Sequence, residues 1–271
     1  MISEKEHFDR VAQAFSYKAG VYDAFGRDHP NLSRMRSKVY AHVLGFLQPG
    51  TRILEINAGT GADAVFFASR GFQVHATDIA PGMIASIQSK IDQYGLQGRL
   101  SAQCCSFTDL SRVEGKPFNY LFSNFGGLNC IEDLSMVTRQ LPGVLAPGGY
   151  LTWVIMPPVC PWDLASAFKG DFRTALRRLR PGGTLANVEG VRFRVYYFTP
   201  GHVMHALGKD FRFVKLEGLS IFSPPADHKE FAQHSPGMYR LLARLDDRVS
   251  SLPVLRGWGD FFILTAVYRP C

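Results

Sequence analysis

A short segment near residue 55 carries side chains that could hold a charged nucleoside. Residues 54–61 read LEINAGTG, so an acid, Glu55, stands four residues before the first of two glycines, Gly59 and Gly61, at an expected strand-to-helix turn. Glycine allows a tight turn and lets a ligand approach where a Cβ would collide. A second acid, Asp78, closes the next expected strand. Because parallel sheets bind ligands at the carboxyl ends of their strands, these acids suit a ligand with ribose hydroxyls and a positive charge.

The same turn also fits a dinucleotide-binding pattern, which is a competing interpretation. Gly59, Gly61 and Ala64 have the required spacing, and Asp78 follows at about the expected distance. However, Glu55 would lie beside the turn that a pyrophosphate must occupy, where a second negative charge is unfavourable. We therefore favour a cationic nucleoside, while a nicotinamide or flavin site and a turn without a ligand stay open.

This turn lies in a region where short strands and helices alternate. Strands are expected at residues 52–56, 73–77, 100–104, 120–123, 150–155, 211–222 and 261–268. Helices are expected over about 62–70, 81–94 and 131–141. Such alternation is typical of βαβ units. It predicts an α/β fold with a Rossmann-like, doubly wound, seven-stranded and mostly parallel sheet that has helices on both faces.

The first 50 residues have the pattern of helices that cover such a sheet. Apolar side chains at positions 8, 11, 12 and 15 have the spacing of a core-facing helix. A connection containing Gly, Tyr and Pro is expected at 19–30, followed by a second helix capped near Asn31. We expect residues 1–50 to form an N-terminal helical lid segment. Residues 51–271 would form one domain, with a substrate-side insertion at about 156–200, acting as an inserted lid, and a second insertion at about 223–257.

Four segments resemble the motifs of class I S-adenosylmethionine-dependent methyltransferases, in that family's order. The pattern Glu-x-x-x-Gly-x-Gly at 55–61 resembles the first motif. The sequence ATDIAPGM at 76–83 resembles the second, in which the acid takes the ribose hydroxyls and the next residue lines the adenine. Residues 118–125 resemble the fourth strand and the loop beside the transferred methyl, and residues 145–151 resemble the turn before the fifth strand. The resemblance implies S-adenosyl-L-methionine as the cofactor.

The resemblance also implies a set of cofactor-binding residues. They are Tyr22, Glu55, Asn57, Ala58, Gly59, Gly61, Asp78, Ile79, Met83, Ser106, Phe107, Asn124 and Phe125. Ser106 departs from the family, which usually places an aspartate there against the adenine amino group. Its hydroxyl could still form that hydrogen bond, and Phe107 could pack on the ring. No metal site is expected.

The motifs predict methyl transfer by in-line displacement to a small-molecule acceptor. Orientation supplies much of the rate, and an oxygen or carbon nucleophile would also need a base. Four histidines could act as that base: His202, His205, His228 and His234. Each is more readily explained as a surface or capping residue, so no catalytic residue is assigned. Further polar candidates for the pocket are Asn129 and Tyr196. Aromatic side chains of the first insertion would suit an aromatic acceptor, and they are Phe168, Phe172, Phe193, Tyr196, Tyr197 and Phe198.

Two other functions stay open. An RNA or protein methyltransferase would use the arginines at positions 173, 177, 178, 180, 192 and 194, three of which share one face of an expected helix over 172–180. A small acceptor with a phosphate or carboxylate would use the same arginines. Residues 124–127 read NFGG, not the Asn-Pro-Pro-Tyr of N6-adenine methyltransferases. A cofactor-binding protein without catalytic activity is the other alternative, suggested by Ser106 and by the lack of an obvious base.

The composition fits a globular, cytoplasmic enzyme. The chain has 271 residues, of which 46% are hydrophobic, and a formal net charge of +7. No apolar run approaches the roughly 18 residues that span a bilayer, and residues 1–6 do not resemble a secretory signal. The five cysteines lack the spacing of a zinc site; we expect buried thiols and a loose one at Cys271. We expect neither a membrane nor a nucleic acid as partner.

Overall fold

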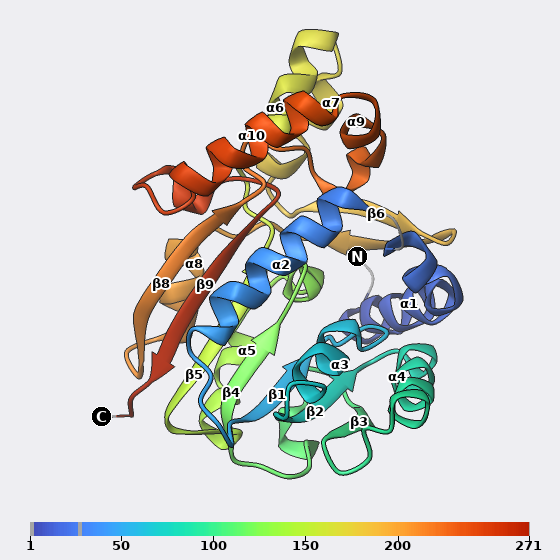
Figure 1. The fold of residues 1–271 in the computed structure, drawn as a ribbon, viewed down its shortest axis with the longest axis vertical. Coiled ribbons are helices and arrows are strands. Elements are labelled where there is room, and N and C mark those ends of the chain that lie inside the picture. The colour runs from blue at the N-terminus through green and yellow to red at the C-terminus, as the bar shows by residue number, and fades with distance from the viewer. Residues whose placement is uncertain (1–2, 27–28, 271) are drawn as a thin grey trace.

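The computed structural model describes residues 3–26 and 29–270, and its framework is a central sheet with helices around it (Figure 1). Its strands are β1 (Arg52–Ile56), β2 (Gln73–Asp78), β3 (Leu100–Cys104), β4 (Phe118–Ser123), β5 (Leu145–Ile155), β8 (Phe211–Leu219) and β9 (Phe261–Tyr268). A separate hairpin consists of β6 (Thr184–Val188) and β7 (Val191–Val195). The helices are α1 (Glu4–Gly26), α2 (Pro30–Leu44), α3 (Ala62–Ala68), α4 (Pro81–Tyr94), α5 (Ser135–Thr138), α6 (Pro161–Ala165), α7 (Phe172–Ala175), α8 (Pro200–Leu207), α9 (Lys229–His234) and α10 (Pro236–Val249).

The main sheet has seven strands in the order β3-β2-β1-β4-β5-β9-β8. The pairs among β1 to β5 are parallel, whereas β9 runs antiparallel to both β5 and β8. The predicted α/β fold with a Rossmann-like, mostly parallel sheet is therefore confirmed. From β1 the chain adds β2 and β3 on one side, and β4 and β5 on the other, so the sheet has its topological switch point at β1. Folds of this kind bind ligands at that point.

Helices cover both faces of the sheet, because successive strand residues point to opposite sides. On β1, Ile53 packs into a core with side chains of α2, α3 and α4, while Leu54 packs into a second core with side chains of α5 and α8. Figure 1 shows α2 and α3 in front of the strands. The turns that join strands to helices are thereby held at one edge of the sheet.

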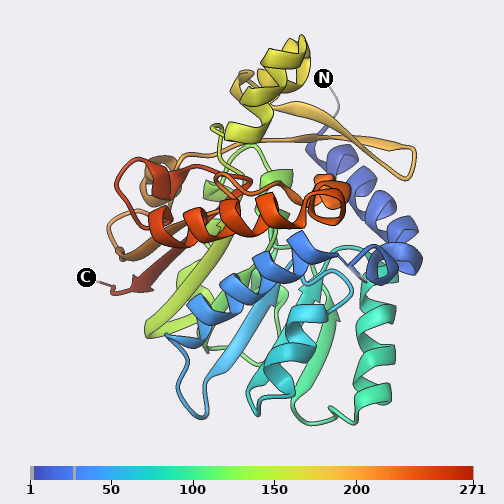
Figure 2. The same ribbon diagram turned by 45° about the horizontal axis from the view of Figure 1, so that its top comes forward.

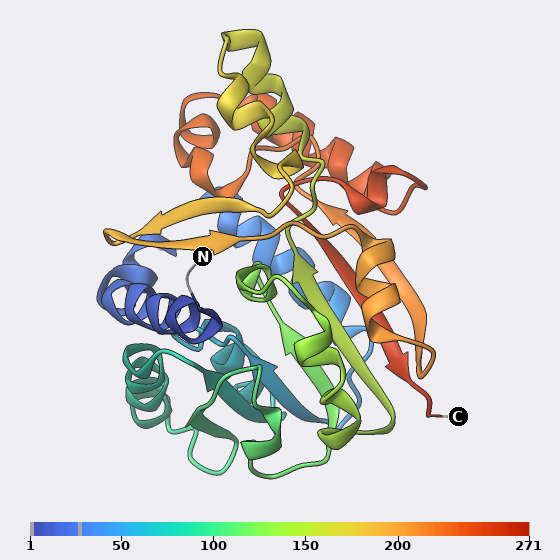
Figure 3. The same cartoon turned by 180° about the vertical axis from the view of Figure 1, so that it is seen from behind.

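Helix α1 packs against α4 and against the β6–β7 hairpin, which crosses the molecule beside it in Figure 3. The predicted connection at 19–22 is wrong, because α1 continues without a break to Gly26. A helical Gly20 costs about 1 kcal/mol relative to alanine, and the ion pair between Asp23 and Lys90 of α4, with 2.6 Å between Nζ and Oδ2, favours continuation. Helix α2 is capped by His29 instead of Asn31, since the Leu32 backbone N–H donates to His29 Nδ1 at 3.3 Å.

Two segments after β5 form a lobe beyond the end of the sheet (Figure 2). One carries α6 and α7, and the other carries α9 and α10. The predicted helix over 172–180 is wrong: α7 ends at Ala175 and a 3-10 turn follows at Arg177–Leu179, where Arg178 turns inward to Asp163 and Asp260. The predicted helix over 131–141 is likewise reduced to α5 and the start of a 3-10 turn at Leu141–Gly143, although the apolar residues that predicted it are buried. In the part of the chain that the structure describes, no helix has the length and apolarity to span a membrane.

Candidate functional site

A cavity lies at the carboxyl ends of β1, β2 and β4, with α1 on one side of it. It holds about 760 Å³ of space that no atom occupies. Its lining comes from α1, α2 and the segments that follow β1, β2, β3 and β4. The lining residues are Val11, Phe15, Tyr22, Arg36, Asn57, Ala58, Gly59, Thr60, Ala62, Asp63, Asp78, Ile79, Met83, Phe107, Asn124, Phe125, Gly126, Gly127 and Cys130.

The turn after β1 is left-handed at three alternate positions. Asn57, Gly59 and Gly61 have φ values of 57°, 55° and 79°. Asparagine is one of the few residues other than glycine that adopts this conformation readily. A Cβ at Gly59 would meet nothing within 4 Å, whereas a Cβ at Gly61 would lie 2.8 Å from Ile87 Cγ1 of α4. Gly59 therefore faces free space at the cavity, while Gly61 allows the turn to approach Ile87 of α4 closely.

Asp78 joins this turn to the end of β2. Its Oδ2 accepts a hydrogen bond from the Gly59 backbone N–H at 2.9 Å, and its Oδ1 accepts one from Ala80 N–H at 2.9 Å. Burial raises the pKa of Asp78 to about 6, although these hydrogen bonds act to lower it. Each carboxylate oxygen can accept a further hydrogen bond. Asp78 can thus hold two hydroxyl groups of a ligand in the cavity.

Glu55 is a buried acid on β1 behind the cavity. Its Oε2 has no hydrogen-bond partner among the described residues. Burial raises its pKa well above the ordinary value, repulsion by Asp63 and Asp78 adds to the rise, and Arg36 opposes it. A buried polar atom without a partner costs free energy that a suitable donor would recover. The acid is therefore an orphaned acceptor beside three charged groups that line the cavity.

Asp63, on α3, fixes three other side chains around the cavity. Its Oδ1 lies 2.9 Å from Arg36 Nε and accepts a hydrogen bond from the Tyr40 hydroxyl at 2.5 Å. Its Oδ2 accepts one from Asn124 Nδ2 at 2.8 Å. The Arg36 guanidinium also lies over the Phe125 ring, 5.3 Å from its centre. Arg36 is thereby oriented by both neighbours, and the acids around the cavity outnumber it, which favours a positively charged ligand.

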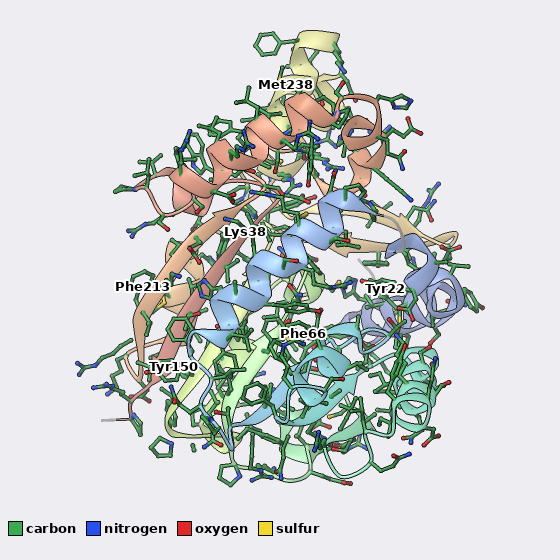
Figure 4. The ribbon with its side chains drawn as sticks, in the orientation of Figure 1. Tyr22, Lys38, Phe66, Tyr150, Phe213 and Met238 are labelled. Carbon is green, nitrogen blue, oxygen red and sulfur yellow. The ribbon has the colours of Figure 1, made fainter. Side chains whose placement is uncertain are left out.

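Helix α1 forms the wall opposite the strands. Tyr22, labelled in Figure 4, lies on the last turns of α1, and burial raises the pKa of its hydroxyl. The next residue, Asp23, accepts a hydrogen bond from the Thr60 hydroxyl at 2.6 Å. Nearer the start of α1, the Phe8 ring meets the Phe107 ring edge-on, with 5.8 Å between centres. The helix is therefore attached at both ends to the segments that carry the cavity.

The structure brings together ten of the thirteen residues predicted to bind the cofactor. They are Tyr22, Asn57, Ala58, Gly59, Asp78, Ile79, Met83, Phe107, Asn124 and Phe125. Glu55, Gly61 and Ser106 do not line the cavity. The prediction for Ser106 is the weakest, because its hydroxyl bonds to the Thr108 hydroxyl at 2.8 Å and accepts from Thr108 N–H at 3.2 Å. It serves a turn.

Several lining residues were missed by the sequence analysis, above all Arg36 and Asp63. The spacing of Arg36 and Tyr40, one helical turn apart, places them on one face of α2, but nothing in the sequence connects that face to Asp63. From the sequence alone, Asp63 is explained as an acid in the first turn of a helix, where a negative charge is favourable.

The other residues predicted for the pocket, or as a base, do not line this cavity. Asn129 is fully buried; its Nδ2 donates to Met156 O at 3.1 Å and to Tyr196 O at 2.6 Å. None of the four candidate histidines lines the cavity, and His228 and His234 lie at helix ends. The six aromatic residues of the insertion are also absent from its lining. Among the cysteines, Cys105, Cys130 and Cys160 are buried and Cys104 is exposed, while Cys271 lies outside the described residues.

Comparison with known proteins finds a methyltransferase domain in the segment that supplies most of the lining of this cavity. Residues 53–149 match a family model described as a methyltransferase domain. The chain is 26% identical over 193 residues to a demethylmenaquinone methyltransferase of Corynebacterium glutamicum strain R, covering 66% of this chain and 71% of that protein. It is 28% identical over 143 residues to the biotin biosynthesis bifunctional protein BioHC of Cellvibrio japonicus, covering 52% of this chain but only 26% of that relative's length.

Solved structures share the fold over nearly the whole chain. The CcbJ methyltransferase of Streptomyces caelestis has a TM-score of 0.60 at 16% identity, covering 93% of this chain and 96% of that one. A 1,6-didemethyltoxoflavin N1-methyltransferase of Burkholderia thailandensis has a TM-score of 0.59 at 15% identity, covering 100% and 92%. The resemblance to class I S-adenosylmethionine-dependent methyltransferases is therefore confirmed.

Proposed function

We propose that this chain, which carries a class I S-adenosylmethionine-dependent methyltransferase domain, methylates a small-molecule acceptor in the cavity at the carboxyl ends of β1, β2 and β4. The observation that carries the proposal is the acidic character of this cavity: Asp63 and Asp78 line it, and Glu55 lies behind it with an unpartnered carboxyl oxygen. A diphosphate would meet these acids with a charge of the same sign, whereas a cationic nucleoside balances them.

The residues around the cavity fit S-adenosylmethionine. Asp78 would accept the ribose hydroxyls, Ile79 and Phe107 would pack on the adenine, and Gly59 leaves space that a Cβ would fill. The orphaned acceptor at Glu55 suits a cationic cofactor, whose charge would stabilise the ionised acid. When bound, the cofactor supplies a methyl group on a positively charged sulfur, which is already electrophilic.

The protein's own contribution is orientation and exclusion of water. Asn124 and Phe125 follow β4, and Asp63 fixes the Asn124 amide at 2.8 Å. Arg36 is held against the Phe125 ring on the same side of the cavity. Side chains of α1 close the opposite side. Alignment of an acceptor for in-line attack can supply roughly 7–11 kcal/mol, so the chain can promote transfer without a histidine in this cavity.

A small acceptor is favoured over RNA or protein because two arginines of the insertion are paired with acids of the protein itself. Arg177 and Arg178 both bind Asp163, with shortest nitrogen–oxygen distances of 2.6 and 2.8 Å. Arg178 also binds Asp260 at 2.8 Å. Charges that are paired within the protein are less available to a polyanion, whose binding depends on neutralising many phosphates.

Two measurements test the proposal. Calorimetric titration should show binding of S-adenosylhomocysteine and none of NAD. The protein is then incubated with methyl-labelled S-adenosylmethionine and with small-molecule, RNA and protein fractions of a cell extract. Label should enter the small-molecule fraction. Binding of NAD alone would overturn the cofactor assignment, and label in RNA, lost steeply with added salt, would overturn the acceptor class. Cofactor binding with no label in any fraction would indicate a binding protein without turnover.

A further inference from the structure

A second cavity, rich in arginine, lies beside the first. It holds about 1520 Å³ of unoccupied space and lies among α7, the β6–β7 hairpin and the start of β9. Five arginines line it, at positions 173, 177, 178, 180 and 194, together with two aspartates, Asp227 and Asp260. The sequence analysis singled out six arginines, three of them on one face of an expected helix, and the structure gathers five of the six around this cavity.

Carboxylates hold the inner two arginines in place. Asp163 accepts hydrogen bonds from Arg177 Nε and Nη2 at 2.6 and 3.1 Å, and from Arg178 Nε at 2.8 Å. Arg178 donates from Nη2 to Asp260 Oδ1 at 2.8 Å and from Nη1 to Asp260 O at 2.9 Å. Its side chain is only 3% exposed. These two guanidinium groups therefore have fixed positions.

The outer three arginines, Arg173, Arg180 and Arg194, are not paired with carboxylates of the described residues. Within residues 3–26 and 29–270, Arg173, Arg180 and Arg194 form no ion pair with a carboxylate at 4 Å or less. Arg194 donates from Nη1 to Gly182 O at 2.9 Å, which leaves its other donors available. The five arginines outnumber Asp163, Asp227 and Asp260, so the cavity carries an excess of positive charge.

Only a thin wall separates this cavity from the one proposed for the cofactor. Met156 and Phe261 line the arginine cavity, and Gly126 lines the cofactor cavity. A Cβ at Gly126 would lie 3.2 Å from both Met156 Cε and Phe261 Cε1. The Phe261 ring also meets the Phe125 ring at 5.6 Å between centres. A ligand anchored among the arginines is therefore within a few side chains of the site of transfer.

We propose that the arginine cavity binds a phosphate or diphosphate group of the methyl acceptor. The proposal rests on the proposed function, because it assigns the acceptor's class. Arginine binds phosphate through pairs of parallel N–H donors. The N–H donors of the fixed inner arginines and of the outer ones would bind the several oxygens of such a group. The negative charge would anchor the acceptor, and the remainder of the molecule would extend past Met156 and Phe261 toward the cofactor cavity.

The phosphoryl group can belong to a soluble molecule or to a lipid headgroup. The same segment exposes large apolar side chains: Phe168 is 96% exposed and Phe172 is 62% exposed. Apolar side chains beside basic ones favour contact with an anionic lipid surface. The experiment therefore has one arm for each source.

The test compares wild type with the double variant Arg173→Gln/Arg180→Gln and with a matched control, Arg192→Gln. Arg192 lies on β7 two residues from Arg194 but does not line the cavity. Inorganic pyrophosphate is titrated by calorimetry at constant ionic strength, and sedimentation with vesicles containing phosphatidic acid is measured against vesicles of phosphatidylcholine. We expect saturable binding by wild type and by Arg192→Gln, and at least about tenfold weaker binding by the double variant.

A parallel titration with S-adenosylhomocysteine separates this inference from the proposed function. Unchanged affinity for S-adenosylhomocysteine shows that the double variant is folded, since both arginines are exposed and neither lines the cofactor cavity. Pyrophosphate binding supports a soluble acceptor, and binding only to phosphatidic acid vesicles supports a lipid one. If wild type binds neither probe better than the double variant does, the inference is overturned while the proposed function stands. If S-adenosylhomocysteine fails to bind, the proposed function fails first.

Discussion

At the scale of single residues, the site is defined by carboxyl groups that are buried and therefore poorly solvated. Asp78 has two backbone N–H partners and still has a pKa raised to about 6. Burial raises the pKa of Glu55 well above its ordinary value, and one of its oxygens has no partner among the described residues. At Asp78, desolvation of the charge therefore outweighs the hydrogen bonds. Such acids are poised to gain from a ligand that brings donors and positive charge.

This predicts that affinity for S-adenosylhomocysteine depends on pH through Asp78. The ionised carboxylate accepts hydrogen bonds best, so affinity should be constant above about pH 7 and fall below pH 6, by up to tenfold for each pH unit. The stability of the free protein should change in the opposite sense. Because the folded-state pKa lies above the ordinary 3.8, the proton stabilises the fold in acid, and that contribution is lost as pH rises through about 6.

Asp78→Asn provides the control, since Glu55 also titrates and must be separated from Asp78. The variant should bind S-adenosylhomocysteine about tenfold or more weakly at pH 7.5, and its affinity should change little between pH 5 and 7. Calorimetric titrations across this range measure both. A pH profile of the variant that parallels wild type would show that another group controls binding.

Residue types and spacing were enough to predict the glycine turn and Asp78, because local backbone geometry and strand ends fix them. They were not enough for Arg36, which reaches the cavity only through the packing of α2 on the sheet. For Ser106 the motif alignment predicts a contact with the adenine, whereas the structure shows its hydroxyl bonded within the local turn, so the contact stays a prediction. Side chains positioned by tertiary packing leave no periodic signal in the sequence.

At the scale of elements, the decisive contact is the close approach of α1 to the start of α4. Gly82 permits it: a Cβ there would lie 2.9 Å from Ser16 O and 3.1 Å from Ser16 Cα, both backbone atoms. The strand positions and the helices over 62–70 and 81–94 were predicted well because periodicity controls them, whereas the helix expected over 131–141 was not. The continuity of α1 past Gly20 was not, because contacts with Lys90 and Thr60 override a weak local helix signal.

We predict that Gly82→Ala weakens the binding of S-adenosylhomocysteine. The added methyl group must push α1 away and displace Val11, Phe15 and Tyr22, which line the cavity. Overpacking of this kind costs about 1–3 kcal/mol, so the dissociation constant should rise roughly 5-fold to 100-fold. Gly20→Ala on α1 is the matched control, because nothing lies within 4 Å of its Cβ position.

The control should behave in the opposite way in a stability measurement. Alanine favours a helix over glycine by about 0.5–1 kcal/mol, so Gly20→Ala should raise the free energy of unfolding in urea and leave the affinity unchanged. Equal affinities for wild type and Gly82→Ala would mean that α1 does not close the cavity in solution.

At the scale of the whole molecule, the segment 156–200 is joined to the sheet by a buried ion pair. Arg178 links Asp163 of that segment to Asp260, which precedes β9, and all three side chains are less than 10% exposed. This contact also explains why an expected helix over 172–180 ends early. We propose, on this basis, that residues 51–271 act as one folding unit in which the segment is an insertion.

The corresponding prediction concerns Arg178→Met. Removing the guanidinium leaves Asp260 buried without its cation, and breaking a buried pair in this way costs about 3–5 kcal/mol. Burial already raises the pKa of Asp260 while Arg178 opposes the rise, so the variant's pKa should be higher still. The loss of stability should therefore be largest at pH 8 and smaller at pH 5, where the carboxyl can take up a proton.

Two further variants isolate the cause. Arg177→Gln removes the half-exposed partner of Asp163 but leaves Arg178 in place, so its cost should be about 1 kcal/mol. Adding Asp260→Asn to Arg178→Met removes the stranded charge and should recover part of the stability, with a flatter pH dependence. Urea denaturation monitored by tryptophan fluorescence measures all four proteins. If Arg178→Met and Arg177→Gln lost equal stability, the segment would be held to the sheet by its apolar contacts and not by the buried charge.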